Sequence, residues 1–209
     1  MILRDLVSCL PRVTIAGSLD ADVHAITASS REVVPGMIFA AIRGTSIDGH
    51  RFINDALAAG ATAILAEVAQ PADYTASATW LHVADSRAAL STLASTLAGH
   101  PWKDLKVAGV TGTNGKTTTA FLLHHIMKTA WHRAGLLGTI LVDDGETSEP
   151  AKHTTPGSIE LSGLLTRMRD NGCRGVALEV SSHGIDQKRV SAIGFDACIF
   201  TNLTQDHLD

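Results

Sequence analysis

Short apolar runs alternate with segments of helical periodicity over the first half of the chain. The runs predict strands at residues 23–29, 37–42, 61–66 and 80–83. Between them, apolar residues at positions 52, 53, 56 and 57 share one face of a predicted helix that begins at Asp48 and is stopped by Gly60. Leucines at positions 90, 93 and 97 predict a second helix over residues 86–97. This order of elements predicts an α/β domain.

The alternation becomes regular from residue 105 onward. Strands are predicted at residues 105–110, 135–142, 175–180 and 195–200. The predicted helices run from the end of a glycine-rich loop to about residue 134 and over residues 158–171, with a polar loop up to Pro150 and another at residues 181–184. Repeated strand–helix–strand units predict a parallel sheet whose ligand site lies at the carboxyl ends of the strands. The breaker at residues 99–101 separates the halves, so we expect domains at residues 1–103 and 104–209.

Composition and charge narrow the class of protein. The 209 residues are 45% hydrophobic and 18% charged, as in a globular α/β protein, and the net charge of −4 argues against a broad nucleic-acid surface. The three cysteines are widely separated and predict neither a disulfide framework nor a metal site. No apolar run reaches the roughly 18 residues of a membrane span, and no secretory signal begins the chain. We therefore expect a cytoplasmic protein with no membrane or nucleic-acid partner.

The strongest candidate chemistry lies in the loop between the strand ending at Val110 and the helix that follows. The Gly-Lys-Thr run at residues 115–117 is typical of a phosphate-binding loop, although the first glycine of the general pattern is replaced by Val110 and Gly112 supplies the turn. Lys116 is expected to reach the terminal phosphates of a nucleotide and Thr117 to hold Mg²⁺. The alternative, a helix entry with threonine caps, leaves the two glycines and the lysine unexplained.

Further polar residues follow the later strands. Glu179 ends an apolar strand, where a carboxylate opposite a phosphate loop is suited to Mg²⁺, the alternative being a solvent-exposed strand end. His207 follows the last strand as a possible second metal ligand or phosphate contact, or as a surface histidine. Ser181 is better suited to substrate hydrogen bonding than to nucleophilic attack, because no nucleophile elbow surrounds it. Gln187, Lys188 and Arg189 form a polar cluster suited to an anionic substrate.

Taken together, these motifs resemble the Mur ligases of peptidoglycan synthesis, and most closely the tripeptide synthetases among them. The resemblance extends over the whole chain and rests on residues 110–118, 153–156, 179–184 with Gln187 and Arg189, and 201–209. In the first domain, residues 27–31 and 44–52 resemble the family's UDP-recognition segments, with Ser29 where the family usually has aspartate. The resemblance implies a small UDP-binding domain followed by a truncated P-loop ATPase domain with a parallel sheet.

The implied reaction is ATP-dependent amide formation on UDP-N-acetylmuramoyl-L-Ala-D-Glu through an acyl phosphate, with diaminopimelate or lysine as the incoming amino acid. Lys116, Glu179 and His207 would be catalytic, and Thr117, Glu179 and His207 would hold Mg²⁺. ATP would be bound by Gly112, Thr113, Asn114, Gly115, Lys116, Thr117 and Thr118. The UDP-linked substrate would be bound by Ala28, Ser30, Thr45, Ser46, Ile47, His153, Thr154, Thr155, Ser181, Gln187 and Arg189.

Members of the family are roughly twice as long, with a carbamylated lysine and an amino-acid-binding domain beyond the segment that corresponds to residues 206–209. We therefore expect either a fragment or a natural truncation that is inactive by itself. Two other functions stay open: a non-catalytic protein that binds a UDP-linked precursor or a nucleotide, and another ligase of the superfamily such as folylpolyglutamate synthase.

Overall fold

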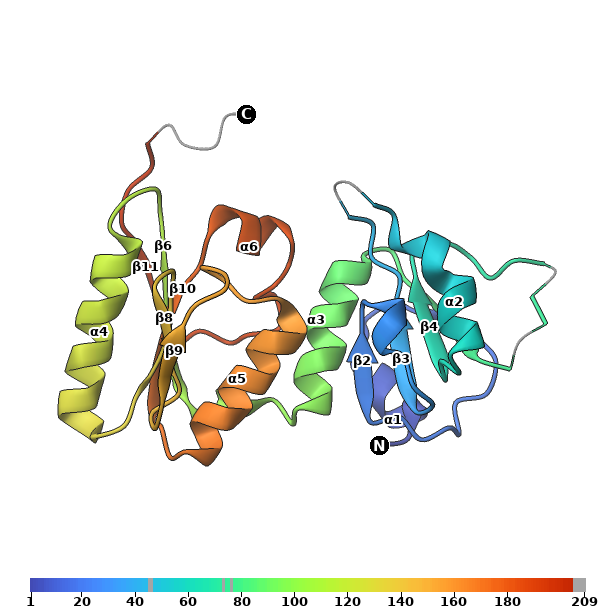
Figure 1. The fold of residues 1–209 in the computed structure, drawn as a ribbon, viewed down its shortest axis with the longest axis horizontal. Coiled ribbons are helices and arrows are strands. Elements are labelled where there is room, and N and C mark those ends of the chain that lie inside the picture. The colour runs from blue at the N-terminus through green and yellow to red at the C-terminus, as the bar shows by residue number, and fades with distance from the viewer. Residues whose placement is uncertain (45–46, 73, 76, 205–209) are drawn as a thin grey trace. The chain divides into compact units, whose positions relative to one another are not determined.

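The computed structural model describes residues 1–44, 47–72, 74–75 and 77–204. The chain divides into two compact units, residues 1–97 and residues 98–209, each with its own sheet and helices (Figure 1). The division lies before the 3-10 helix Pro101–Asp104, whereas the predicted boundary after residue 103 falls inside that helix. No helix among the described residues is long and apolar enough to cross a bilayer.

The first unit is built on a five-stranded sheet with the order β1-β5-β4-β3-β2. Strands β2 to β5 are parallel, and β1 pairs with β5 in the antiparallel direction. The strands are β1 (Thr14–Ala16), β2 (Ala25–Thr27), β3 (Met37–Ala40), β4 (Ala63–Ala66) and β5 (Thr79–His82). The helices are α1 (Leu3–Val7), α2 (Ile53–Ala58) and α3 (Ser86–Leu97), with 3-10 turns at Ser30–Glu32 and Gly49–Phe52.

Both faces of this sheet are buried. Ile38 and Leu65 belong to the core cluster that includes α1 and α3, whereas Phe39 and Ile64 pack with Ile53 of α2 on the other side. Alternate residues of a strand point to opposite faces, so a strand covered by helices on both sides reads as a continuous apolar run. That is the pattern that predicted β3 and β4.

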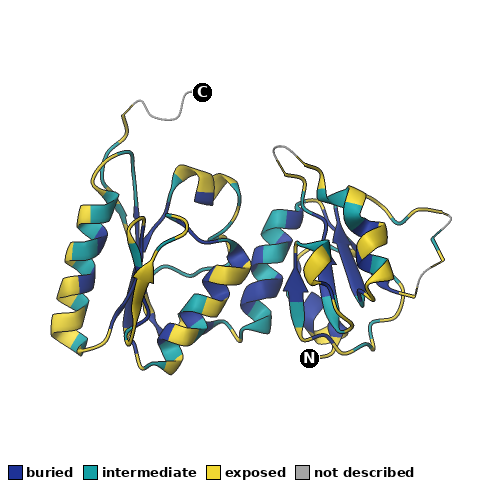
Figure 2. Cartoon of the chain, viewed as in Figure 1, coloured by how far each residue is buried: buried dark blue, intermediate teal, exposed yellow. Residues whose placement is uncertain are grey.

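The second unit has a six-stranded sheet with the order β11-β6-β10-β7-β8-β9. Its parallel strands are β11 (Ala197–Phe200), β6 (Lys106–Thr111), β10 (Gly175–Glu179) and β7 (Gly135–Leu137). Helix α4 (Lys116–Trp131) covers one face, and α5 (Ser158–Asp170) and the short α6 (Ser182–Asp186) lie on the other (Figure 1). The central strands β6 and β10 are almost wholly buried, whereas much of α4 is exposed (Figure 2).

The predicted strand at residues 135–142 is wrong in one respect, because it is two strands. β7 ends at Leu137, the chain turns through Gly138 and Thr139, and β8 (Leu141–Asp143) returns antiparallel to β7. Part of the predicted polar loop then pairs with β8 as β9 (Ser148–Pro150). The predicted loop at residues 181–184 contains the first turn of α6. Strands of three residues are too short to show a period, which is also why β1 was missed.

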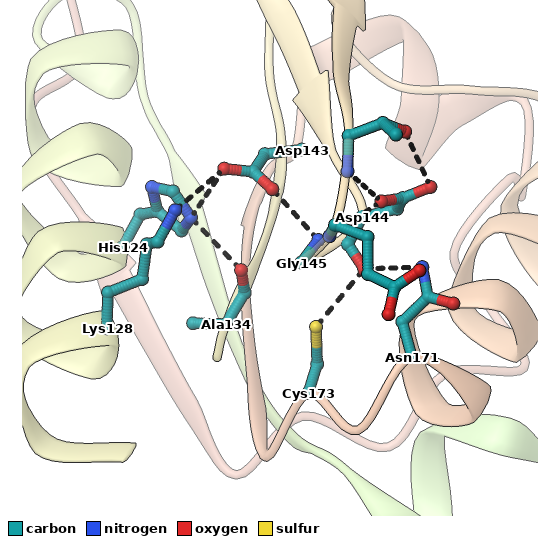
Figure 3. Close-up of polar contacts among 10 residues, drawn as sticks. His124, Lys128, Ala134, Asp143, Asp144, Gly145, Asn171 and Cys173 are labelled. Atoms are coloured by element: carbon teal, nitrogen blue, oxygen red, sulfur yellow. Dashed lines mark hydrogen bonds and ion pairs between the residues drawn. The ribbon is translucent and has the colours of Figure 1, made fainter. Parts of the chain in front are cut away.

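Buried carboxylates hold the turn between β8 and β9 in place (Figure 3). Asp143 accepts a hydrogen bond of 2.8 Å from the backbone N–H of Gly145 and lies 3.2 Å from Lys128 Nζ and 3.4 Å from His124 Nε2, both on α4. Burial lowers the pKa of His124, outweighing the nearby Asp143 carboxylate, and its Nε2 also lies 3.1 Å from the carbonyl oxygen of Ala134. The hairpin is thereby tied to the helix that follows the phosphate loop.

The neighbouring Asp144 ties the same turn to α5. Its side chain accepts from the backbone N–H groups of Glu146 and Thr147 and lies 2.8 Å from Arg167 Nε. The thiol of Cys173 donates to the carbonyl oxygen of Asp144 at 3.3 Å (Figure 3), and burial raises the pKa of this thiol to about 11. A thiol with such a pKa stays protonated at neutral pH, so Cys173 is a packing residue.

Candidate functional site

The loop predicted to bind phosphate connects the end of β6 to the first turn of α4. Gly112 and Gly115 have φ angles of +131° and +84°, which residues with a side chain rarely adopt. A Cβ atom at Gly112 would lie only 2.8 Å from the carbonyl oxygen of Asn202. Both positions therefore require glycine for the backbone conformation, and position 112 also requires it because there is no space for a Cβ atom.

The segment after β11 fixes the shape of this loop. The backbone N–H of Asn114 donates to Asn202 Oδ1 and that of Thr113 donates to the carbonyl oxygen of Asn202, both at 3.0 Å. The hydroxyl of Thr201 donates to the carbonyl oxygen of Asn114 at 2.7 Å. Sequence reasoning gave Thr201 and Asn202 no individual roles. Their position could have indicated the contact, because they directly follow a predicted strand of a parallel sheet, and residues 112–115 directly follow another strand of the same sheet.

The amino-terminal turn of α4 is open toward a cleft of about 320 Å³. Among the described residues no side chain caps this helix end, and the first N–H groups of a helix lack intrahelical acceptors. Lys116 Nζ donates to the carbonyl oxygens of Gly112 and Thr113 at 2.7 and 2.9 Å. The cleft is lined by hydroxyl, amide and ammonium groups, at residues 113–118, Thr139, Thr154 and Ser181. This arrangement suits a phosphate group, since N–H donors, a helix dipole and a cation converge there.

Glu179 lies at the carboxyl end of β10 with no exposed surface. Its Oε2 accepts from Thr117 Oγ1 at 2.9 Å and from Thr139 Oγ1 at 3.1 Å, and its Oε1 accepts from the backbone N–H of Thr139 at 2.9 Å. A carboxylate and a hydroxyl this close together are hard oxygen donors of the kind that Mg²⁺ takes alongside nucleotide phosphates. The residues therefore fit the expected metal. The alternative of a solvent-exposed strand end is wrong for Glu179.

A second polar cluster joins the loop before α5 to the loop after β10. The buried Thr155 donates to the carbonyl oxygen of Glu179 at 3.0 Å and accepts from the backbone N–H of Ser181 at 2.9 Å. Arg189 Nη1 donates to the carbonyl oxygen of Thr155 at 2.6 Å, and Arg189 Nη2 donates to Gln187 Oε1 at 2.7 Å. The structure thus brings together four of the predicted substrate residues, Thr155, Ser181, Gln187 and Arg189.

A further cleft of about 270 Å³ adjoins the loop on the side of α6 and β11. Gly112, Lys116 and Ser181 line it together with the apolar side chains of Ile185 and Phe200. Thr113, Lys116 and Ser181 line both clefts, so these three residues lie at the border between them. His153 is exposed, and no contact of its side chain joins it to the cluster in the described part of the chain.

The remaining predicted substrate residues belong to the first unit. Ala28 directly follows β2, Ser30 begins the first 3-10 turn, and Ile47 is 56% exposed in the loop after β3. Because β2 and β3 are adjacent and parallel, these positions follow the carboxyl ends of neighbouring strands, where ligands of α/β sheets bind. Thr45, Ser46 and His207 lie outside the described residues.

Two family models match the chain. Residues 22–97 match the model described as Mur ligase family, catalytic domain, and residues 110–209 match the Mur ligase middle domain. The two matches cover most of both structural units.

Curated relatives carry the name UDP-N-acetylmuramoyl-L-alanyl-D-glutamate--2,6-diaminopimelate ligase. The protein of Bacteroides fragilis is 44% identical over 209 residues, and the protein of Geobacter sulfurreducens is 41% identical. In both cases all of this chain is covered, whereas the match takes in only 43% and 41% of the relative. The chain thus spans less than half the length of the relatives it matches.

Solved structures share the fold. One of a UDP-N-acetylmuramoyl-L-alanyl-D-glutamate--2,6-diaminopimelate ligase superposes with a TM-score of 0.79 at 24% identity, over the whole of this chain and 42% of the other. The MurF ligase from Thermotoga maritima in complex with ADP has a TM-score of 0.54 at 26% identity, over 90% of this chain and 39% of the other. Both likenesses extend over the two units described above.

Proposed function

This chain belongs to the Mur ligase family, and from that premise we propose that it supplies the nucleotide-binding and precursor-binding parts of an ATP-dependent amide ligase. The reaction is the addition of an amino acid to UDP-N-acetylmuramoyl-L-alanyl-D-glutamate, as the names of the relatives indicate for those proteins. Those names favour 2,6-diaminopimelate over lysine as the amino acid. Because the relatives are more than twice as long, these 209 residues alone are not expected to complete the ligation.

The observation that carries the nucleotide assignment is the uncapped start of α4 beside the Thr117–Glu179 pair. A triphosphate bound there would accept hydrogen bonds from the first N–H groups of the helix. Lys116 already points its ammonium group over the loop and has three N–H donors, of which two are used by Gly112 and Thr113. The ADP complex of the MurF ligase from Thermotoga maritima, a protein of the same fold, supports a nucleotide ligand.

In the proposed chemistry the γ-phosphoryl group of ATP passes to a carboxylate of the precursor, and the incoming amine then displaces phosphate from the acyl phosphate. Negative charge develops on the transferring group, and Lys116 together with the helix N–H donors stabilises it. Mg²⁺ held by Thr117 and Glu179 would neutralise further charge on the phosphates. His207 is proposed as a second metal ligand.

Residues proposed to bind parts of the precursor occur in each unit. Ser181, Gln187 and Arg189, with His153, Thr154 and Thr155, would bind the muramoyl-peptide portion. Thr154 and Ser181 line the nucleotide cleft, and a chain of hydrogen bonds joins Ser181 to Thr155, Arg189 and Gln187. Arg189 is held by Thr155 and Gln187, so its orientation is set before a substrate carboxylate arrives. Ala28, Ser30, Thr45, Ser46 and Ile47 would bind the UDP end.

Calorimetric titration of the 209-residue chain with a magnesium complex of a non-hydrolysable ATP analogue tests the nucleotide assignment. The wild type should bind, and Lys116→Ala should weaken binding about 10- to 100-fold, because hydrogen bonds to charged groups contribute about 1.5–3 kcal/mol. Lys103→Ala makes the same change of charge on the exposed Lys103 of the second unit and should leave the affinity unchanged. Equal binding by the wild type and Lys116→Ala would refute the assignment.

Titration with UDP-N-acetylmuramoyl-L-alanyl-D-glutamate separates the proposed function from its alternatives. Binding of this precursor supports a ligase of peptidoglycan synthesis. Nucleotide binding without any affinity for the precursor would instead favour another member of the superfamily, such as a folylpolyglutamate synthase.

A further inference from the structure

Thr139 occupies the turn where the chain leaves β7 and reverses into β8. It is exposed, and it lines the cleft at the start of α4 together with Thr117 and Thr154. Thr139 is part of no recognisable sequence motif, since a single threonine after a strand is an ordinary turn residue. What distinguishes Thr139 is its set of contacts with the buried carboxylate of Glu179.

Thr139 contacts both oxygens of that carboxylate. Its backbone N–H donates to Oε1 at 2.9 Å, and its hydroxyl donates to Oε2 at 3.1 Å. The close approach depends on the preceding residue, because a Cβ atom at Gly138 would collide with Glu179 Oε1. Two donors from one residue, each on a different oxygen, fix the plane of the carboxylate as well as its position.

The other donor to Glu179 is Thr117 Oγ1, at 2.9 Å from Oε2. A hydroxyl has one hydrogen, and a hydroxyl oxygen that binds a cation points its lone pairs toward it. A Thr117 hydroxyl that gives a lone pair to a metal keeps its hydrogen for Oε2, and the contacts from Thr139 hold the same carboxylate from the turn between β7 and β8. We propose that Thr139 is a positioning residue for Glu179, holding this carboxylate in the orientation that binds the nucleotide-associated divalent cation.

The same hydroxyl reaches toward the precursor side of the site. Thr139 Oγ1 lies 3.1 Å from Thr154 Oγ1. Thr139 is the donor in this contact as well as in the contact with Glu179 Oε2, so these two acceptors share its one hydroxyl hydrogen, whereas its backbone N–H is donated to Glu179. Thr139 thus lies between the carboxylate proposed to bind the metal and a residue proposed to contact the muramoyl peptide.

This inference rests on the proposed nucleotide site and is tested by binding rather than by turnover. The full 209-residue chain is titrated with a non-hydrolysable ATP analogue, once in excess Mg²⁺ and once in EDTA. Thr139→Val has nearly the shape of threonine and loses only the hydroxyl, so it should weaken binding in Mg²⁺ about tenfold, as loss of an outer-shell partner commonly does. Binding in EDTA should not change. Thr139→Ser retains the hydroxyl and should stay within about twofold of the wild type.

Each outcome separates the hypotheses. Equal affinities of wild type and Thr139→Val in Mg²⁺ would overturn the inference while leaving the nucleotide site intact. Equal losses in Mg²⁺ and EDTA would also overturn it, since they show a structural role that is independent of the metal. A wild type that binds no nucleotide would remove the proposed function, and the inference with it. If Thr139→Val does not fold, as judged by thermal unfolding, Thr139→Ala provides the same comparison against Thr139→Ser.

Discussion

Glu179 and His124 are ionisable side chains that the second unit buries in different surroundings. Glu179 is fully buried and has donors for both oxygens. His124 is buried on α4, where its Nε2 lies near one carbonyl and one carboxylate oxygen, and its pKa is lowered because burial disfavours the charged imidazolium. The first arrangement belongs to the proposed metal site, whereas the second connects the β8–β9 hairpin to α4.

The lowered pKa of His124 predicts how stability depends on pH. In the unfolded chain this histidine titrates near its ordinary value of 6.5, and in the folded chain it titrates below that value. The unfolded state therefore binds more protons just below pH 6.5. The stabilisation is fully present above that pH and is lost as the pH falls through the folded pKa, by at most about 1.4 kcal/mol per pH unit.

Urea unfolding between pH 7.5 and 5 measures the free energy of unfolding of the wild type and of His124→Gln. As the pH falls, the wild type should lose stability relative to His124→Gln, because only the wild type has the buried imidazole. A pH-independent difference for His124→Gln would show that burial of this imidazole has no linkage to folding.

At the scale of elements, the junction of β6, the phosphate loop and α4 has the strictest geometric requirements. Gly112→Ala places a methyl group against the backbone of Asn202 at a φ of +131°. We expect a loss of about 1–3 kcal/mol in unfolding free energy, the usual cost of such strain, together with loss of nucleotide binding.

Gly163→Ala is the control within the same unit. Gly163 lies inside α5, and a Cβ atom there meets nothing within 4 Å, so alanine should stabilise the helix by about 0.5–1 kcal/mol. Chemical denaturation of both variants and calorimetry with the ATP analogue provide the measurements. Nucleotide binding by Gly112→Ala at wild-type affinity would show that the loop does not need its present conformation.

The elements also show what can be predicted from a sequence and what cannot. The buried strands β6 and β10 and the helix α4 follow from apolar runs and glycine placement, which act locally. The β8–β9 hairpin does not, because its strands are three residues long and depend on Asp143 and Asp144 contacting α4 and α5. The same contrast holds for the candidate site. Glu179 could be identified as a candidate residue from its position at the end of an apolar strand. Thr139 and Asn202 come close to the site only when distant segments fold together, and a single sequence does not show which distant segments meet.

At the scale of the whole molecule, the residues proposed to bind ATP lie in the unit of residues 98–209, and those proposed to bind the UDP end lie in the unit of residues 1–97. Each unit has its own sheet and apolar core. The nucleotide contacts proposed for residues 112–118, Thr139 and Glu179 are internal to one unit, so nucleotide binding can be examined in the chain as it stands.

A crystal structure of the chain with Mg²⁺ and a non-hydrolysable ATP analogue tests the central claim most directly. The account predicts that the terminal phosphates occupy the cleft of about 320 Å³ at the start of α4, within hydrogen-bond distance of the Lys116 ammonium group. It also predicts that the metal lies next to Thr117 and Glu179. A nucleotide bound elsewhere, or phosphates at this loop with the metal remote from Glu179, would contradict it.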